Sequence, residues 1–96
     1  MAMVEAVRKA QRTPAQQMNE MIGPDPHRPG PDRARLIEYG IPVWALIAHL
    51  QGLDGDLSQV AHDYEIPEDA VVAALAYYLQ HKAAIDTRIA INAAAA

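Results

Sequence analysis

The longest apolar stretch without a helix breaker runs from Val71 to Ile89. Its sequence, VVAALAYYLQHKAAIDTRI, is rich in Ala and Leu, which have the highest helix propensities. The pattern predicts one long helix over residues 71–89 that begins near Pro67, with Glu68 and Asp69 at its positive end. Residues 92–96, which follow it, are expected to fray.

Two shorter helical patterns precede this stretch. The segment VWALIAHLQ, residues 43–51, is apolar on nearly all sides and follows Pro42, so it predicts a buried helix. Residues 57–64 follow Asp56, which is placed as a helix N-cap. The sequence Glu65-Ile66-Pro67 separates this second helix from the long one.

The first forty residues carry weaker patterns. Residues 3–12 have a loosely helical spacing of apolar positions, and Thr13-Pro14 is a helix start that predicts a short helix over residues 14–22. The segment GPDPHRPGPD, residues 23–32, holds four prolines and two glycines and predicts a linker or an extended segment. The segment RARLIEY, residues 33–39, is compatible with a strand or with a turn of helix.

The two helices around Glu65-Ile66-Pro67 can be placed on the pattern of roughly twenty residues that is typical of a helix-turn-helix motif. The positions that this motif buries are all apolar or aromatic, namely Val60, Ala61, Tyr64, Ile66, Val71 and Ala74. Glu65 stands where the turn usually has Gly. The expected fold is all-α, with a trihelical helix-turn-helix (homeodomain-like) core in residues 41–91. A Pro-rich N-terminal arm, residues 1–40, precedes it, and residues 92–96 form a tail.

The residues that this pattern directs toward DNA are poorly suited to recognising bases. They are Pro67, Glu68, Asp69, Val72, Ala73 and Ala76. None is Arg, Lys, Asn or Gln, the side chains that read base edges, and the two acids are repelled by phosphates. The apolar strip of Val72, Ala73 and Ala76 favours contact with protein instead.

The charge distribution separates the arm from the rest of the chain. The net charge is −4, and residues 1–40 hold six of the eight basic residues against five acids. Residues 41–96 hold only Lys82 and Arg88 against seven acids, so the folded body is expected to be acidic. Any contact with DNA is therefore expected from the arm, through Arg8, Lys9, Arg12, Arg33 and Arg35.

Composition narrows the classes of function. The 96 residues allow one small domain, and the absence of Cys excludes a disulfide scaffold and fits a reducing compartment. Neither a signal peptide nor a transmembrane run is recognisable, so a cytoplasmic protein without a membrane segment is expected. The four His residues lack metal-ligand spacing, and no nucleophile elbow or phosphate loop is present. No enzyme activity, metal or cofactor is expected.

Two motifs carry a resemblance to a known family. They are Ile41-Pro42-Val43-Trp44 and Ala74-Leu75-Ala76-Tyr77-Tyr78, the second followed by His81 and Ile85-Asp86. With these motifs, residues 41–89 resemble the small bacterial proteins catalogued as domain of unknown function 433, which are helix-turn-helix antitoxin-like proteins. Members commonly have Gly-Thr-Arg before Ile-Pro-Val and a short N-terminal strand that helps them dimerise. Here Glu38-Tyr39-Gly40 stands in that place.

The resemblance implies the antitoxin of a type II toxin–antitoxin pair, which binds and sterically inhibits a PIN-like ribonuclease toxin and whose complex often represses its own promoter. The residues expected to bind the toxin are Tyr78, His81, Lys82, Ile85, Arg88, Ile89 and Ile91. Arg88 is expected to reach the metal-binding carboxylates of the toxin, because a guanidinium pairs bidentately with carboxylate. Two alternatives stay open: a DNA-binding repressor that uses the basic arm, and a plain helical dimerisation or adaptor module. A homodimer is also left open.

Overall fold

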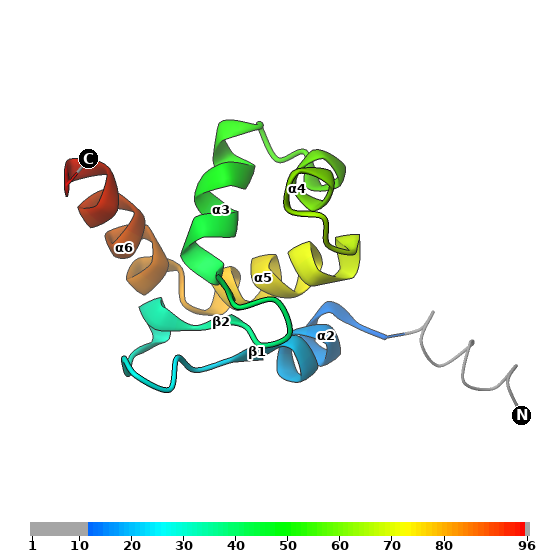
Figure 1. The fold of residues 1–96 in the computed structure, drawn as a ribbon, viewed down its shortest axis with the longest axis horizontal. Coiled ribbons are helices and arrows are strands. Elements are labelled where there is room, and N and C mark those ends of the chain that lie inside the picture. The colour runs from blue at the N-terminus through cyan, green and yellow to red at the C-terminus, as the bar shows by residue number, and fades with distance from the viewer. Residues whose placement is uncertain (1–11, 96) are drawn as a thin grey trace, which may run out of the picture.

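The computed structural model describes residues 12–95, which form a mostly helical body with a small sheet (Figure 1). The elements, in chain order, are α2 (Pro14–Met21), β1 (Ile22–Gly23), the 3-10 helix η1 (Pro31–Arg33), β2 (Arg35–Leu36), β3 (Ile41–Pro42), α3 (Val43–Gly52), α4 (Leu57–Tyr64), α5 (Glu68–Gln80) and α6 (Lys82–Ala95). The expectation of an all-α fold is confirmed in its main feature, a mostly helical body, and the small sheet of three two-residue strands is an addition that the sequence did not predict. The weak helical pattern over residues 3–11 lies outside the described residues.

The sheet is antiparallel, with the strand order β1-β2-β3. Leu36 of the central strand pairs with Ile22 on one side and Ile41 on the other. Its side chain is almost fully buried, at 1% exposed, so it ties the sheet to the helical core. Gly40 closes the turn between β2 and β3 with φ 67, a backbone conformation that favours glycine. The segment RARLIEY therefore contributes a short strand and this turn.

The helix predicted at Thr13-Pro14 is confirmed as α2. The Thr13 hydroxyl accepts a hydrogen bond from the Gln16 backbone N–H at 3.1 Å, and the Gln16 side chain accepts one from the Thr13 N–H at 2.8 Å. This reciprocal capping box satisfies two donors that a helix start otherwise leaves without partners. The N-terminal arm is thus structured from Thr13 onward, and α2 is available to pack on the body.

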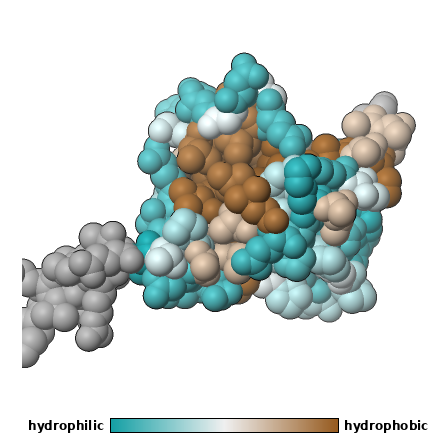
Figure 2. Space-filling model, turned by 180° about the vertical axis from the view of Figure 1, so that it is seen from behind, coloured by the Kyte–Doolittle hydropathy of each residue, from teal (hydrophilic) through white to brown (hydrophobic). Residues whose placement is uncertain are grey.

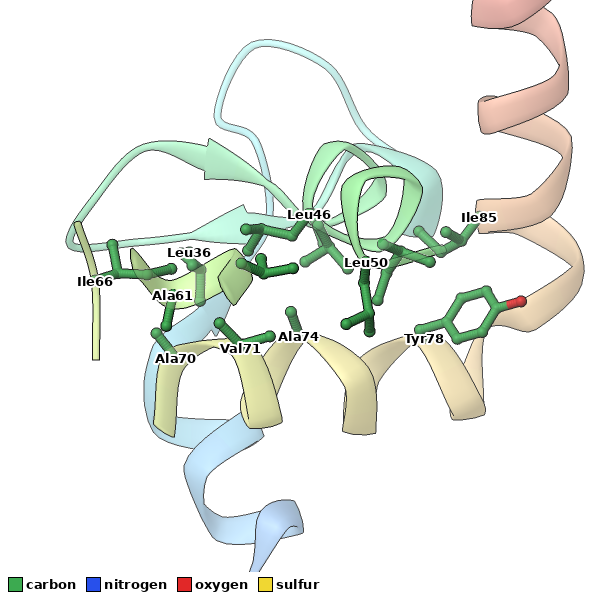
Figure 3. Packing of buried hydrophobic residues seen from close by; sticks show 14 residues of the cluster. Leu36, Leu46, Leu50, Ala61, Ile66, Ala70, Val71, Ala74, Tyr78 and Ile85 are labelled. Atoms are coloured by element: carbon green, nitrogen blue, oxygen red, sulfur yellow. The ribbon is translucent and has the colours of Figure 1, made fainter. Parts of the chain in front are cut away.

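The core lies between α3, α4 and α5, with Ile85 of α6 closing one end (Figure 3). Figure 3 shows Val71 and Ala74 pointing from α5 toward Leu46 and Leu50 of α3. Of the positions predicted to be buried, Tyr64 is half-buried, and the remaining ones are buried: Val60, Ala61, Ile66, Val71 and Ala74. The pattern of apolar residues in 57–74 was therefore sufficient to identify the core face of α4 and α5.

The connection between α4 and α5 uses the predicted cap and turn residues. The Asp56 side chain accepts a hydrogen bond from the Gln59 backbone N–H at 3.1 Å, which confirms Asp56 as the N-cap of α4. Glu65 ends α4 in the left-handed conformation, with φ 55 and ψ 47. A side chain with a Cβ atom is strained in this conformation, which explains why Gly is usual at this place.

The single long helix predicted over residues 71–89 is wrong, because the chain bends at His81 between α5 and α6 (Figure 1). The bend turns α6 back toward α3, so that Ile85 becomes fully buried and Ile89 packs against the core. The burial of these two side chains contributes apolar stabilisation that offsets the interrupted helix. Residues 92–95, which belong to the tail expected to fray, form the last turn of α6.

Candidate protein-binding surfaces

One flank of α5 is covered by the N-terminal arm. Among the described elements, α2 and α5 share the most extensive contact, and α2 lies beside α5 in Figure 1. Ala73 of α5 is fully buried without belonging to the core cluster of α3, α4 and α5. The prediction that Ala73 faces DNA is therefore wrong, because α2 occupies the space next to that flank of α5.

A different flank of α5 remains open. Val72, Leu75 and Leu79 are spaced three and four residues apart, which places them on one side of a helix. Val72, Leu75 and Ala76 are half-buried, and Leu79 is 67% exposed. Seen from behind, the molecule shows a continuous apolar area framed by hydrophilic residues (Figure 2). We call Val72, Leu75, Ala76 and Leu79 the α5 strip.

Tyr78, expected to touch a toxin, belongs to the core instead. Tyr78 is 9% exposed, and its hydroxyl donates a hydrogen bond to Asp86 Oδ1 at 2.7 Å. The Lys82 ammonium donates to Asp86 Oδ2, also at 2.7 Å. The hydrogen bond to Asp86 raises the pKa of Tyr78, and the one from Lys82 lowers the pKa of Asp86. These three groups fasten the bend between α5 and α6, and only Lys82 among them is well exposed.

Arg88 is also engaged within the chain. Its Nε and one terminal nitrogen lie 2.9 and 2.7 Å from Asp32 Oδ2, so Arg88 joins α6 to η1. The hydrogen bond from Arg88 lowers the pKa of Asp32. The expectation that Arg88 reaches the carboxylates of a toxin stays a prediction, and in this structure two of the guanidinium nitrogens donate to a carboxylate of the same chain.

The apolar residues of α6 fall into an inner and an outer half. Ile85 is 0% exposed and Ile89 is half-buried, so the expectation that Ile85 contacts a partner is wrong. In the outer half, residues 90–95 are all exposed. Ile91 lies there with 51% of its surface exposed. Of the predicted apolar contact residues, Ile91 is the one that the structure leaves accessible.

His81 lines a cavity that no sequence pattern indicated. The cavity has a volume of about 590 Å³ and lies between α2, the segment after β1 and the end of α5. The His81 ring stacks on Tyr77, with centroids 4.3 Å apart. The Tyr77 hydroxyl donates to the Pro31 carbonyl at 2.6 Å, and burial raises the pKa of Tyr77. The Pro-rich segment is thus attached to α5 through Tyr77.

The basic residues expected to contact DNA are partly neutralised by neighbouring acids. Arg12 forms an ion pair with Glu20, and Arg33 Nε lies 3.6 Å from Asp32 Oδ2. Arg35 is half-buried in β2. Arg8 and Lys9 lie outside the described residues. Among the described residues, the surface around Arg12 and the surface around Arg33 therefore each carry a carboxylate beside the guanidinium.

The described residues also give no indication of a metal site or of a membrane-spanning helix. Across residues 12–95, His, Asp and Glu side chains form no cluster of three that could hold a metal ion. Over the same range, no helix is both long enough and apolar enough to cross a membrane. His49 instead forms a hydrogen bond with Asp63 at 2.7 Å, which lowers the pKa of Asp63 and joins α3 to α4.

Comparisons of the chain with protein-family models, with curated proteins and with solved structures find no match. The resemblance of residues 41–89 to the antitoxin-like family therefore stays a prediction that depends on the quoted motifs.

Proposed function

We propose that this chain is an antitoxin that binds and inhibits a PIN-like ribonuclease, with the outer half of α6 as its main contact. The observation that carries the proposal is that residues 90–95 are helical and exposed, with the apolar Ile91 among them. A helix of this kind is suited to the apolar groove of another protein. The resemblance of residues 41–89 supplies the class of partner.

We further infer a helix-turn-helix arrangement for α4 and α5, supported by the buried positions and by the left-handed Glu65 in the turn. In such an arrangement α5 is the recognition helix. Two observations argue against its use on DNA. Its exposed start carries Glu68 and Asp69, which phosphates repel, and α2 covers one of its flanks. Contact with a protein is therefore favoured over reading of DNA.

Inhibition in this proposal is steric. The inner half of α6 is held on α3 by Ile85 and on η1 by the pair of Arg88 with Asp32. This anchoring gives the outer half a defined direction, which reduces the conformational entropy lost on binding. The occupied groove of the ribonuclease would then exclude RNA without any chemical step on the antitoxin.

The test begins with the gene beside this one. If it encodes a PIN-like nuclease, that protein is co-expressed with the intact chain, copurified and assayed for RNA cleavage. We expect a stable complex and loss of cleavage. Ile91→Glu should weaken the complex by at least about tenfold, because it places a charge in an apolar contact. Ile37→Glu is the matched control, since Ile37 is 62% exposed but lies after β2, away from α6.

Three outcomes would contradict the proposal. They are a failure to copurify, unimpaired cleavage in the complex, and equal weakening by Ile37→Glu and Ile91→Glu. A mobility-shift assay with the chain's own upstream DNA addresses the second hypothesis. Salt-sensitive binding that is lost on neutralisation of the arginines in the arm, without any nuclease complex, would favour a repressor.

A further inference from the structure

We propose that two copies of this chain associate by exchanging α6, so that α5 and α6 of each copy join into one straight helix. In the exchanged dimer, α6 of each copy occupies the site on α3 and η1 of the other. The inference concerns the chain alone and is independent of any toxin. Exchange of an identical element between copies is a low-cost route to a dimer, because it reuses contacts that the monomer already makes.

The break between α5 and α6 has no local cause in the sequence. Residues 68–95 contain neither Gly nor Pro, the usual residues at a sharp bend in a helix. His81 leaves the helical conformation at the break, with φ −130 and ψ 35. It also stands directly before α6, where Ser, Thr, Asp or Asn would cap a helix start. Residue propensities therefore favour one continuous helix, and the contacts of α6 with the rest of the chain impose the break.

The contacts that hold α6 are made with segments earlier in the chain. Ile85 is fully buried where α6 packs on α3, and Figure 1 shows α6 beside α3 rather than in line with α5. Arg88 donates two hydrogen bonds to Asp32 Oδ2 in η1. The contact of α6 with α3 and with η1 is more extensive than its contact with α5. All of these contacts can form when α6 comes from a second copy, so the site itself identifies its occupant.

One side-chain contact distinguishes the two states. The Tyr78 hydroxyl donates to Asp86 Oδ1 at 2.7 Å across the bend. In a straight helix these residues would lie about 12 Å apart along the axis, and the Tyr78 side chain would lean away from Asp86. Lys82 and Asp86 are four positions apart within α6, so their ion pair is kept in either state. The bent monomer therefore gains the Tyr78 hydrogen bond, and the exchanged dimer gains the backbone hydrogen bonds of an uninterrupted helix.

Analytical ultracentrifugation of the full chain, unfolded in urea and refolded at a series of protein concentrations, measures the association. Refolding lets each α6 pack within its own chain or on another one. We expect the mass to rise from 10.5 kDa toward about twice that value as the concentration increases. Tyr78→Phe should lower the dissociation constant by about tenfold, because it removes a hydrogen bond that only the bent monomer makes, twice per dimer.

The pair of Arg88 with Asp32 reveals which chain supplies α6. Asp32→Arg places two cations at this contact and Arg88→Asp places two anions there, so each variant alone should hold α6 weakly. When the two variants are refolded together, an exchanged heterodimer sets unlike charges against each other at both contacts. We expect a 1:1 heterodimer from the mixture and from neither variant alone. The double variant, which carries the reversed pair within one chain, is the matched control and should dimerise as the parent does.

Two substitutions at His81 test the straight helix. At an interior position, Gly lowers the equilibrium constant for helix formation about fivefold relative to Ala. An exchanged dimer contains two such positions, so the dissociation constant of the His81→Gly dimer should exceed that of the His81→Ala dimer by about 25-fold. Both variants remove the same imidazole, so each is the control for the other. A dimer in which α5 and α6 stay bent would show no such difference.

The proposal is overturned by a chain that stays monomeric at every concentration after refolding. It is equally overturned if the mixed charge variants form no heterodimer, or if Asp32→Arg alone dimerises as strongly as the parent. Equal dissociation constants for His81→Gly and His81→Ala, with both folds intact by circular dichroism, would refute the straight helix. None of these measurements involves a nuclease, so their outcome is separate from that of the antitoxin proposal.

Discussion

Ile85→Ala distinguishes a core residue from a partner-binding residue. Ile85 is 0% exposed and lies where α6 packs on α3. The substitution removes three carbon atoms, so at about 0.8 kcal/mol per buried CH₂ the lost transfer free energy is about 2.4 kcal/mol. A residual cavity adds to this loss, which brings the expected destabilisation to about 3 kcal/mol.

This loss is large for a chain of this size. At about 0.05–0.15 kcal/mol per residue, the free energy of unfolding of 96 residues is roughly 5–14 kcal/mol. A loss of about 3 kcal/mol should lower the melting temperature by roughly 12–24 °C. Thermal unfolding followed by far-UV circular dichroism, with urea titration as a second measurement, reports the change.

Ile91→Ala is the matched control on the same helix. Ile91 is 51% exposed, so its truncation should change the free energy of unfolding by no more than about 0.5 kcal/mol. If Ile85→Ala melted like the parent chain and yet lost a protein partner, Ile85 would be a contact residue. The packing of α6 on α3, and the physical reason given for the bend at His81, would then be wrong.

Three further substitutions test local features by the same melting assay. Asp32→Asn should cost about 1 kcal/mol at neutral pH, because it weakens the partly buried link to Arg88. The folded-state pKa of Asp32 is lowered from 3.8, so the link stabilises the chain above that pH and its contribution is lost as the pH falls through the lowered pKa. The difference in melting temperature between parent and Asp32→Asn should therefore narrow below pH 3.8, and a constant difference would contradict this cause. Glu65→Gly should stabilise the chain by about 0.5–1 kcal/mol, because it relieves the left-handed backbone at φ 55, and a loss of stability would show that Glu65 makes a compensating contact. Asp56→Ala should cost about 1 kcal/mol through the lost cap of α4, whereas Asp56→Asn, which keeps an acceptor, should cost little.

Much of the fold could be predicted from local signals. The caps at Thr13 and Asp56 and the breaks at Pro67 and after Tyr64 set the helix ends to within a residue or two. The apolar spacing in residues 57–74 identified the buried face of α4 and α5. These features depend on contacts within a few residues, so composition and spacing are sufficient to find them.

The candidate sites were predicted less well, because accessibility depends on contacts between distant segments. Nothing in the sequence indicated that Arg88 pairs with Asp32, because the two residues are 56 positions apart. Ile85 and Ile91 are both apolar residues of the same helical stretch, yet one is buried and the other exposed. The packing of α6 on α3 buries Ile85 and not Ile91, and the helix propensity of residues 71–89 did not indicate the bend at His81 that brings the two helices together.

The sequence by itself determined a mostly helical chain, the starts of α2, α3, α4 and α5, the core face of α4 and α5, and the absence of base-reading side chains at the start of α5. Propensity, capping and apolar period act locally, and each is visible in the residue order. Only the tertiary structure decided which flanks of that helix remain open. The arm folds back so that α2 covers one flank of α5, and the bend brings α6 onto α3. Burial of apolar area between segments far apart in sequence favours both arrangements, and among residues 12–95 it leaves Leu79 of the α5 strip and Ile91 of α6 exposed.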